Sequence, residues 1–389
     1  MAGSLTSRTL ARPSFETAFE PPAFLRAMLA FESALAVAQA EEGMIPQASA
    51  KTIAAVCEEL DPDVDALVAE AKRSATLVVP LVSSLRAAVG KVDAAAAKHV
   101  HFGSTTQDVL DTAMALCLKP CLEEADRSLE GAVRALARRA IEHRATPMLG
   151  RTLMQPAIAM SAGVKVARWA LALAADRERL ADAQAIALAI QCGGPIGTQQ
   201  GLGARGLAVR KHVARRLGLA DTPSWQAHRN AWIDLLDRIG LIVITAGKIA
   251  RDLSLASQPE VGEMRESPPV AGVGASSAMP HKRNPVGCVQ ALAAAIRMPG
   301  LLASLHAAAI AENERALGGW QAELVLVPEI AGTLGLSLDF LETISAGLVV
   351  DAARMRTNLE AYGEEPHAGP ERCRPAVDEL LGALAPYLS

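Results

Sequence analysis

The stretch from Gly274 to Pro285 carries several side chains that could take part in catalysis. Ser276 offers a hydroxyl that could transfer a proton, Lys282 a positive charge for an anion, and Asn284 amide donors and an acceptor. Glycines and prolines precede the stretch and apolar residues at helical spacing follow it, which predicts a loop that leads into a helix. Backbone N–H groups at such a helix start would help to hold a carboxylate. Taken alone, the same residues could also form a flexible linker with a solvated basic turn.

Two further polar segments interrupt an otherwise apolar chain, and each adjoins a predicted long helix. The first, 101–108, contains His101 and three successive hydroxyl side chains: Ser104, Thr105 and Thr106. One hydroxyl could cap the helix that follows, but three in a row beside a histidine are better explained as ligands for a carboxylate. His101 could equally be a core histidine that bonds to the backbone. The second segment, 150–156, contains Arg151, Thr152 and Gln155.

The stretch from Gly274 to Pro285 resembles the signature loop of the fumarase/aspartase superfamily, which reads Gly-Ser-Ser-x-Met-Pro-x-Lys-x-Asn-Pro. The residues that match are Ser276, Ser277, Met279, Pro280, Lys282, Asn284 and Pro285. In that superfamily the first serine of the pair, here Ser276, is the catalytic base. The resemblance therefore implies catalytic roles for Ser276 and Lys282, with Ser277, Met279 and Asn284 in contact with the substrate.

The other two polar segments resemble further conserved regions of the same superfamily. Segment 101–108 is similar to the first, Gly-(Ala/Ser)-(Thr/Ser)-(Thr/Ser)-Gln-Asp, which implies that His101 is catalytic and that the three hydroxyls after it bind substrate. Segment 150–156 is similar to the second, usually Thr-His-x-Gln. This implies substrate-binding roles for Arg151, Thr152 and Gln155.

Leu153 departs from that second region, because several lyases of the superfamily have a histidine there, near the leaving group. A leaving amine or hydroxide needs a proton from a general acid. A leaving carboxylate, whose conjugate acid has a pKa of about 4, does not. The loss of the acid indicates a substrate whose C–O bond breaks to, or forms from, a carboxylate, which describes a lactone.

Segments 191–206, 225–229 and 312–323 resemble the bacterial 3-carboxy-cis,cis-muconate cycloisomerases. That family usually has a tryptophan where this chain has Leu153 and often a histidine where it has Pro156. The resemblance implies interconversion of 3-carboxy-cis,cis-muconate and a carboxymuconolactone, in the protocatechuate branch of the β-ketoadipate pathway. Arg315 is a candidate to hold a carboxylate, although it could instead pair with Glu312 or Glu323.

Two alternatives to the cycloisomerase remain open. One is a related lyase that acts on a succinyl-type substrate, such as adenylosuccinate. The other is a catalytically inactive homologue that keeps only the helical bundle, as lens crystallins of the superfamily do. The presence of Ser276, Lys282 and Asn284 argues against an inactive homologue.

The composition fits a protein with a large core and no general affinity for polyanions. The chain has 389 residues, of which 51% are hydrophobic and 3% aromatic, with a formal net charge of -4. We expect a cytoplasmic protein, since the start lacks an apolar signal-peptide core and no uncharged apolar run is long enough to span a membrane. Its six cysteines form no Cys-x-x-Cys pair, so buried thiols are expected and a metal site is not. Proton transfer and anion binding require no cofactor.

The elements that must position these residues are predicted to be helices, because no strand-like alternation of any length is found. Apolar periodicity predicts five long helices: 108–142, 157–190, 228–257, 286–311 and 320–347. Helices of this length need a shared axis. We therefore expect an all-α fold of the fumarase/aspartase type, with an N-terminal helical domain (1–106), a central five-helix bundle (107–347) and a short C-terminal helical segment (348–389).

Parts of two predicted helices, around 170–190 and 285–310, are apolar nearly all round. A helix without a polar face is buried on every side, so subunits are expected to pack bundle against bundle in a homotetramer. The three polar segments adjoin different helix ends and can meet only if different subunits contribute them. The predicted active sites are therefore shared between subunits and bind a small polycarboxylate, with no nucleic acid or membrane partner.

Overall fold

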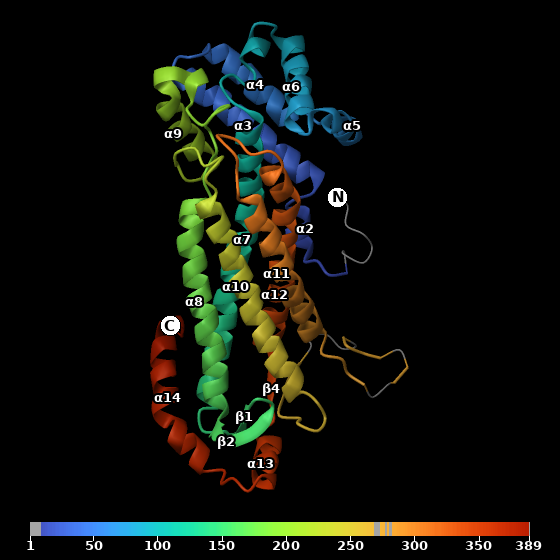
Figure 1. Cartoon of the computed structure of the whole chain (residues 1–389), viewed down its shortest axis with the longest axis vertical. Helices are drawn as coiled ribbons and strands as arrows, with labels where there is room; N and C mark the ends of the chain where they lie inside the picture. The colour runs from blue at the N-terminus through green and yellow to red at the C-terminus, as the bar shows by residue number, and fades with distance from the viewer. Residues whose placement is uncertain (1–8, 268–272, 277, 280–281, 389) are drawn as a thin grey trace.

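The computed structural model describes residues 9–267, 273–276, 278–279 and 282–388. Its centre is a bundle of five long helices that lie along the long axis of the molecule (Figure 1). These are α7 (Thr106–Glu142), α8 (Ala162–Ala187), α10 (Asn230–Ala256), α11 (Val286–Ala308) and α12 (Gly319–Gly347). The predicted all-α fold with a central bundle is confirmed.

The periodic apolar rows that predict these helices form the core. On α7, residues such as Leu110, Leu129 and Leu136 are completely buried, and they recur at the three- and four-residue spacing that keeps one helix face toward its neighbours. The helix continues past Pro120, which the sequence predicted to kink it. At ~1.5 Å per residue α7 is about 55 Å long, so its two ends are far apart.

A second group of helices covers the end of the bundle where α7 begins (Figure 1). They are α3 (Pro21–Glu41), α4 (Gln47–Glu59), α5 (Val64–Ser74), α6 (Val78–Val92), η1 (Ala96–His99), η2 (Gln200–Arg205) and α9 (Gly206–Leu217). The short α2 (Pro13–Thr17) packs on α12 instead. We call this end of the bundle the upper end.

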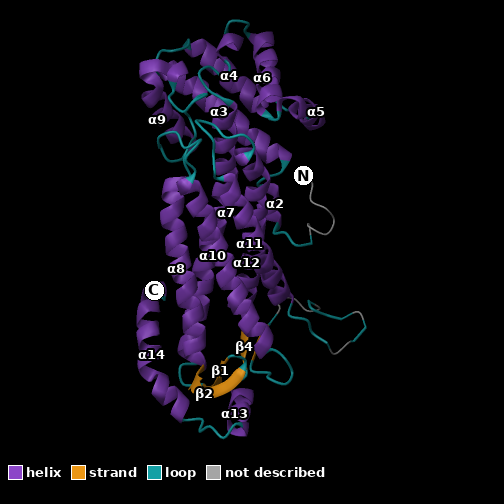
Figure 2. Ribbon diagram, in the orientation of Figure 1, coloured by secondary structure: helices purple, strands orange, loops and turns teal. Residues whose placement is uncertain are grey.

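In the described part of the chain, the opposite, lower end carries four short strands, although the sequence shows no strand-like alternation (Figure 2). Two antiparallel pairs form: β1 (Pro147–Thr152) with β2 (Gln155–Ser161), and β3 (Met264–Glu266) with β4 (Leu348–Val350). Helix α8 consequently begins at Ala162, where the sequence predicted a start near Ala157. The turn of the first hairpin lacks the Asn-Gly or Asp-Gly pair that makes a hairpin visible in a sequence.

The C-terminal part follows β4 as α13 (Ala352–Ala361), α14 (Ala368–Leu384) and η3 (Ala385–Tyr387). Helix α14 packs on β2 and runs back along α8, so it covers the outside of the hairpin (Figure 1). We propose 1–106, 107–347 and 348–389 as the three parts of the chain, with α9 packed on α3 although it belongs to the middle range.

Among the residues that the structure describes, three helices are long and apolar enough, by length and composition alone, to cross a membrane: α3, α11 and α12. This differs from the expectation that no run reaches that length, because one or two charges are allowed here. All three pack against other helices of the fold. Helix α11 nevertheless leaves Val289 and Ile296 exposed, at 56% and 72%.

Candidate active site

Outside the signature loop, the predicted site residues lie in two groups at opposite ends of the bundle. Segment 101–108 and Arg315 lie at the upper end, where α7 and α12 begin. The hairpin that carries Arg151, Thr152 and Gln155 lies at the lower end, where α10 ends and α11 begins. One chain therefore brings each group together but keeps the two groups about the length of a long helix apart.

Arg315 binds two of the predicted hydroxyls at the upper end. Its Nη1 donates to Thr105 Oγ1 at 2.8 Å, and its Nη2 donates to Thr106 Oγ1. The alternative that Arg315 pairs with Glu312 or Glu323 is wrong for the described residues. Glu312 instead accepts from the Leu317 N–H, and Glu323 pairs with Arg229. The structure thus joins a guanidinium and two hydroxyls, which are three donors that suit a carboxylate.

Asp108 anchors this end of α7, and the sequence analysis did not identify it. Its carboxylate is completely buried and accepts from the Gly193 and Gly194 N–H groups at 2.8 and 3.0 Å. It also accepts from the Thr105 N–H at 3.0 Å and from Ser104 Oγ at 3.1 Å. Ser104 is therefore bound to this carboxylate, and the glycine-rich loop is fastened beside the hydroxyl segment. The only sequence signal was the aspartate that closes the first conserved region.

A buried ion-pair cluster lies behind Arg315. The Arg229 guanidinium donates to Asp111 at 2.7 and 3.1 Å and to Glu323 at 3.0 Å, and all three side chains are at most 5% exposed. Burial lowers the pKa of Arg315, although the charges of Asp108 and Asp111 act to raise it. Asp111 thus pairs with Arg229, and its charge also favours the Arg315 guanidinium in front of the cluster.

His101 lies in the turn before α7, where it contacts α3. Its Nδ1 donates to Glu32 Oε1 at 2.5 Å, and Glu32 is only 1% exposed. Burial acts to lower the pKa of His101, but the charge of Glu32 and the hydrogen bond to it outweigh burial and raise it. His101 is thus held by a carboxylate, which differs from the alternative of a core histidine bonded to the backbone.

At the lower end, Arg151 is engaged within the fold. Its Nη1 and Nη2 donate to the two oxygens of Glu263 at 2.8 Å each, and Glu263 is completely buried. Asn358 donates to the same carboxylate at 2.8 Å. Glu263 therefore fastens the hairpin to α13 and to the segment that leads toward the signature loop.

The tip of the hairpin projects into solvent. Leu153 and Met154 form a two-residue turn in the left-handed region, with φ of 49° and 66°, and they are 96% and 70% exposed. Thr152 and Gln155, which flank the turn, are exposed as well. Branched and long side chains rarely adopt this conformation, which costs on the order of 1–3 kcal/mol per residue. The Leu153 side chain is therefore not buried among apolar side chains of its own chain.

The signature loop is described in part, and Ser277 lies outside the described residues. Ser276 Oγ accepts from the backbone N–H groups of Ala278 and Met279, at 3.3 and 3.2 Å. Met279 and Lys282 are exposed, and the Asn284 N–H donates to the Gly274 carbonyl at 2.8 Å. Two backbone donors therefore point at the oxygen of the predicted catalytic serine, as an alkoxide would require.

Glu266, a second residue that the sequence analysis missed, holds the base of this loop. Its carboxylate accepts from the Gly287 and Cys288 N–H groups, at 3.0 and 3.1 Å, in the first turn of α11. A carboxylate at a helix N-terminus is favoured by unpaired N–H groups and by the helix dipole. The start of the loop and the start of α11 are thus tied together.

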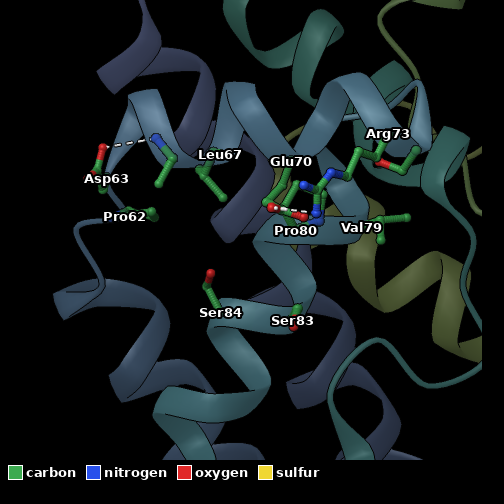
Figure 3. Close-up of a pocket in the computed structure, with 11 residues that line it drawn as sticks. Pro62, Asp63, Leu67, Glu70, Arg73, Val79, Pro80, Ser83 and Ser84 are labelled. Atoms are coloured by element: carbon green, nitrogen blue, oxygen red, sulfur yellow. Dashed lines mark hydrogen bonds and ion pairs between the residues drawn. The ribbon is translucent and has the colours of Figure 1, made fainter.

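A hollow of about 500 Å³ lies between α5 and α6 (Figure 3). Its lining includes Asp63, Glu70, Arg73, Ser83 and Ser84. Asp63 caps α5, and Glu70 pairs with Arg73. These charged groups already have partners within the fold, and no predicted site residue is among those that line the hollow.

Comparison with known proteins places this geometry in context. A family model described as lyase matches residues 8–300. The chain is 40% identical to a 3-carboxy-cis,cis-muconate cycloisomerase of Bradyrhizobium diazoefficiens, over 92% of this chain and 79% of that protein. It is 38% identical to a nitrosuccinate lyase of Streptomyces davaonensis, over 97% and 81%. The crystal structure of 3-carboxy-cis,cis-muconate lactonizing enzyme from Pseudomonas putida matches with a TM-score of 0.86 and 35% identity, over 92% of this chain and 80% of that one.

Proposed function

Because this chain belongs to the lyase family of the fumarase/aspartase superfamily, we propose that it is an enzyme that interconverts 3-carboxy-cis,cis-muconate and a carboxymuconolactone. The observation that carries the proposal is the pair of N–H groups aimed at Ser276 Oγ, in a chain similar to several cycloisomerases over most of its length. The absence of an acid at Leu153 supports a reaction in which the bond to oxygen involves a carboxylate.

In the lactone-forming direction, one substrate carboxylate oxygen forms a C–O bond to an alkene carbon. The π electrons of that double bond take up a proton at the adjacent carbon, and Ser276 supplies it. Unaided serine is too weak an acid, so the N–H groups of Ala278 and Met279 and the Lys282 charge stabilise the alkoxide. A solvent proton then restores the hydroxyl, and the whole reaction takes up one proton.

The remaining carboxylates of the substrate need donors. Arg315 with Thr105 and Thr106 supports such a role, because a guanidinium beside two hydroxyls binds a carboxylate through charge-assisted hydrogen bonds. The other substrate-binding residues that we propose are Ser104, Thr152, Gln155, Ser277, Met279 and Asn284. Arg151 is the least favoured of the predicted ligands, since Glu263 occupies both of its terminal nitrogens.

We further propose a cytoplasmic homotetramer in which different subunits contribute the upper-end and lower-end residues to one site. The separation of the two groups within a chain supports this arrangement. The exposed Val289 and Ile296 on α11 and the exposed hairpin tip at Leu153 and Met154 supply apolar surface for subunit contacts. In such a tetramer, another subunit rather than a membrane covers the apolar face of α11.

A second candidate function is a lyase that eliminates a group from a substituted succinate. The similarity to a nitrosuccinate lyase favours it. A nitrite leaving group is also a weak base, so the missing acid at position 153 fits nitrite loss as well as lactonisation. Elimination of an amine, as from adenylosuccinate, fits that position less well.

An ultraviolet assay separates these functions. Purified protein is incubated with 3-carboxymuconate, and loss of the conjugated diene is followed. Parallel samples contain nitrosuccinate or adenylosuccinate, with formation of fumarate as the readout. We expect turnover of 3-carboxymuconate that depends on Ser276. If the protein converted one of the succinates but not 3-carboxymuconate, the second candidate would replace the proposed function.

A further inference from the structure

His101 adopts a backbone conformation that its surroundings must enforce. Its φ is +62°, in the left-handed region, and Gly103 two residues later has a φ of +71°. A non-glycine residue there costs on the order of 1–3 kcal/mol and persists only where neighbouring groups over-determine the turn. Two side chains of α3 hold it: Glu32 through the imidazole, and Gln39 through the Phe102 carbonyl at 2.6 Å.

The burial of the Glu32 carboxylate costs free energy. It is 1% exposed in the middle of α3, where Met28, Leu29 and Phe31 are also buried. Its Oε1 accepts from His101, while its Oε2 has no hydrogen-bond partner among the described groups. A buried carboxylate with one partner stabilises a fold less than an apolar side chain of the same size would. Stability therefore does not explain Glu32, whereas control of the imidazole does.

The hydrogen bond fixes which nitrogen is available. A carboxylate only accepts, so Nδ1 carries a proton, and Nε2 is the ring nitrogen that Glu32 does not hold. The His101 side chain is 16% exposed, and no described group of the protein is bonded to Nε2. The ring lies in the same segment as Thr105 and Thr106, which bind Arg315.

From this geometry, and resting on the proposed function, we propose that Glu32 is a positioning residue that keeps His101 oriented and positively charged, so that its Nε2–H donates to a carboxylate of the substrate. In this arrangement Glu32 does not touch the substrate. It acts through the imidazolium, as the carboxylate of a histidine–carboxylate pair does.

The charged groups that face His101 agree in sign with this role. Glu32 of α3 and Asp108 of α7 favour the imidazolium, and Arg86 of α6 opposes it. Cys57 of α4 faces Glu32, and burial, followed by the charge of Glu32, raises the pKa of that thiol to about 12, so it stays neutral. Since the pKa of His101 is raised, the imidazolium persists to higher pH than in an ordinary histidine and is lost as pH rises through the folded value.

Glu32→Gln removes the charge of the carboxylate but keeps an acceptor for Nδ1–H. An opposite charge at this distance shifts a pKa by about one to three units. We expect the imidazole resonances of His101, assigned by their absence in His101→Gln, to titrate about one unit or more lower in Glu32→Gln. The alkaline limb of kcat/KM should move to lower pH by the same amount, with little change at pH 6.

Gln39→Leu is the matched control, because it removes the other anchor of the same turn from the same helix without changing charge. We expect it to lower thermal stability and leave the His101 titration in place. An equal displacement of the titration in Gln39→Leu would mean that both anchors merely hold the turn, which overturns the proposal. So would an ordinary pKa for His101 in the unmodified protein, a measurement that needs no variant to fold.

The two readouts separate this inference from the proposed function. The titration is measured on the free protein and does not depend on any substrate. A lowered His101 pKa in Glu32→Gln without diene loss in any form refutes the proposed function alone. The positioning role alone is refuted if 3-carboxymuconate is turned over normally and the alkaline limb of kcat/KM lies at the same pH in Glu32→Gln and the unmodified protein.

Discussion

At the scale of single residues, substitution of Ser276 is the most direct test of the proposed chemistry. Ser276→Ala removes the hydroxyl that two N–H groups surround, and it should reduce kcat by about a thousandfold. The change lies in a loop, so circular dichroism and thermal stability should stay those of the unmodified protein. If Ser277→Ala were the more damaging of the pair, the other serine would be the proton carrier.

Leu153 allows a test of the leaving-group argument. Histidine adopts the left-handed conformation more readily than leucine, so Leu153→His is compatible with the turn, where the side chain is 96% exposed. Lactonisation needs no acid there, and we expect turnover of 3-carboxymuconate to stay level or fall a few-fold. An amine-eliminating lyase would gain from the new acid. Adenylosuccinate cleavage that rises in Leu153→His would contradict the cycloisomerase.

How much of the site the sequence predicts depends on how far apart the interacting residues lie in the chain. The serine, lysine and asparagine of the signature loop stand within one short string and are recognisable from it. Glu32 and His101 are 69 residues apart, and Glu266 and Gly287 are 21 apart, with no local pattern joining them. A lone glutamate in an apolar helix gives no sign of its partner until the fold brings the two together.

At the scale of elements, Glu266 joins β3 to the first turn of α11. Glu266→Ala removes a buried carboxylate that accepts two N–H bonds, and it should lower the free energy of unfolding by about 2–4 kcal/mol. We expect kcat to fall as well, because the loop that carries Ser276 starts and ends at this contact. Denaturant unfolding and diene turnover measure the two effects.

Two variants make that experiment specific. Glu266→Gln keeps one acceptor and should lie between the unmodified protein and Glu266→Ala. Glu329→Ala removes an exposed carboxylate whose ion pair with Arg297 spans 3.5 Å, and such pairs contribute at most about 1 kcal/mol. If Glu329→Ala lowered the free energy of unfolding as much as Glu266→Ala does, the buried contact of Glu266 would have no special role in stability.

Long helices were predictable from sequence and the hairpin was not, for one physical reason. Helix α7 repeats its apolar pattern over many turns, so each turn adds evidence for the same period. The β1–β2 hairpin is short, and its turn at Leu153 and Met154 uses residues that disfavour the required conformation. Tertiary packing against α13 and α14 forms this hairpin against the local preference.

At the scale of the whole molecule, the proposed tetramer predicts a mass of about four times the 40.6 kDa chain in light scattering. Ile296→Lys places a charge on the exposed apolar face of α11 and should dissociate the subunits, with loss of activity. A stable, active monomer would contradict both the assembly and the shared sites.

Complementation tests the sharing directly. Ser276→Ala inactivates the signature loop, and His101→Gln inactivates the upper-end group of site residues. If one site draws these residues from different chains, equal mixing of the two variants leaves about a quarter of the sites intact. We expect activity to approach that fraction after subunit exchange, which mass spectrometry of the mixed assembly verifies. No recovery in verified mixed tetramers would show that each chain supplies a whole site.

Five of the six thiols are buried, and they are distributed over different parts of the fold: Cys57, Cys117, Cys121, Cys192 and Cys288. A water-borne alkylating reagent reaches each of them only when its own element opens, because the buried thiol is both inaccessible and protonated. The chain therefore carries natural probes of local unfolding in α4, in α7, beside Asp108 and at the start of α11. Timed alkylation followed by peptide mapping would read out the order in which these regions open, without any introduced label.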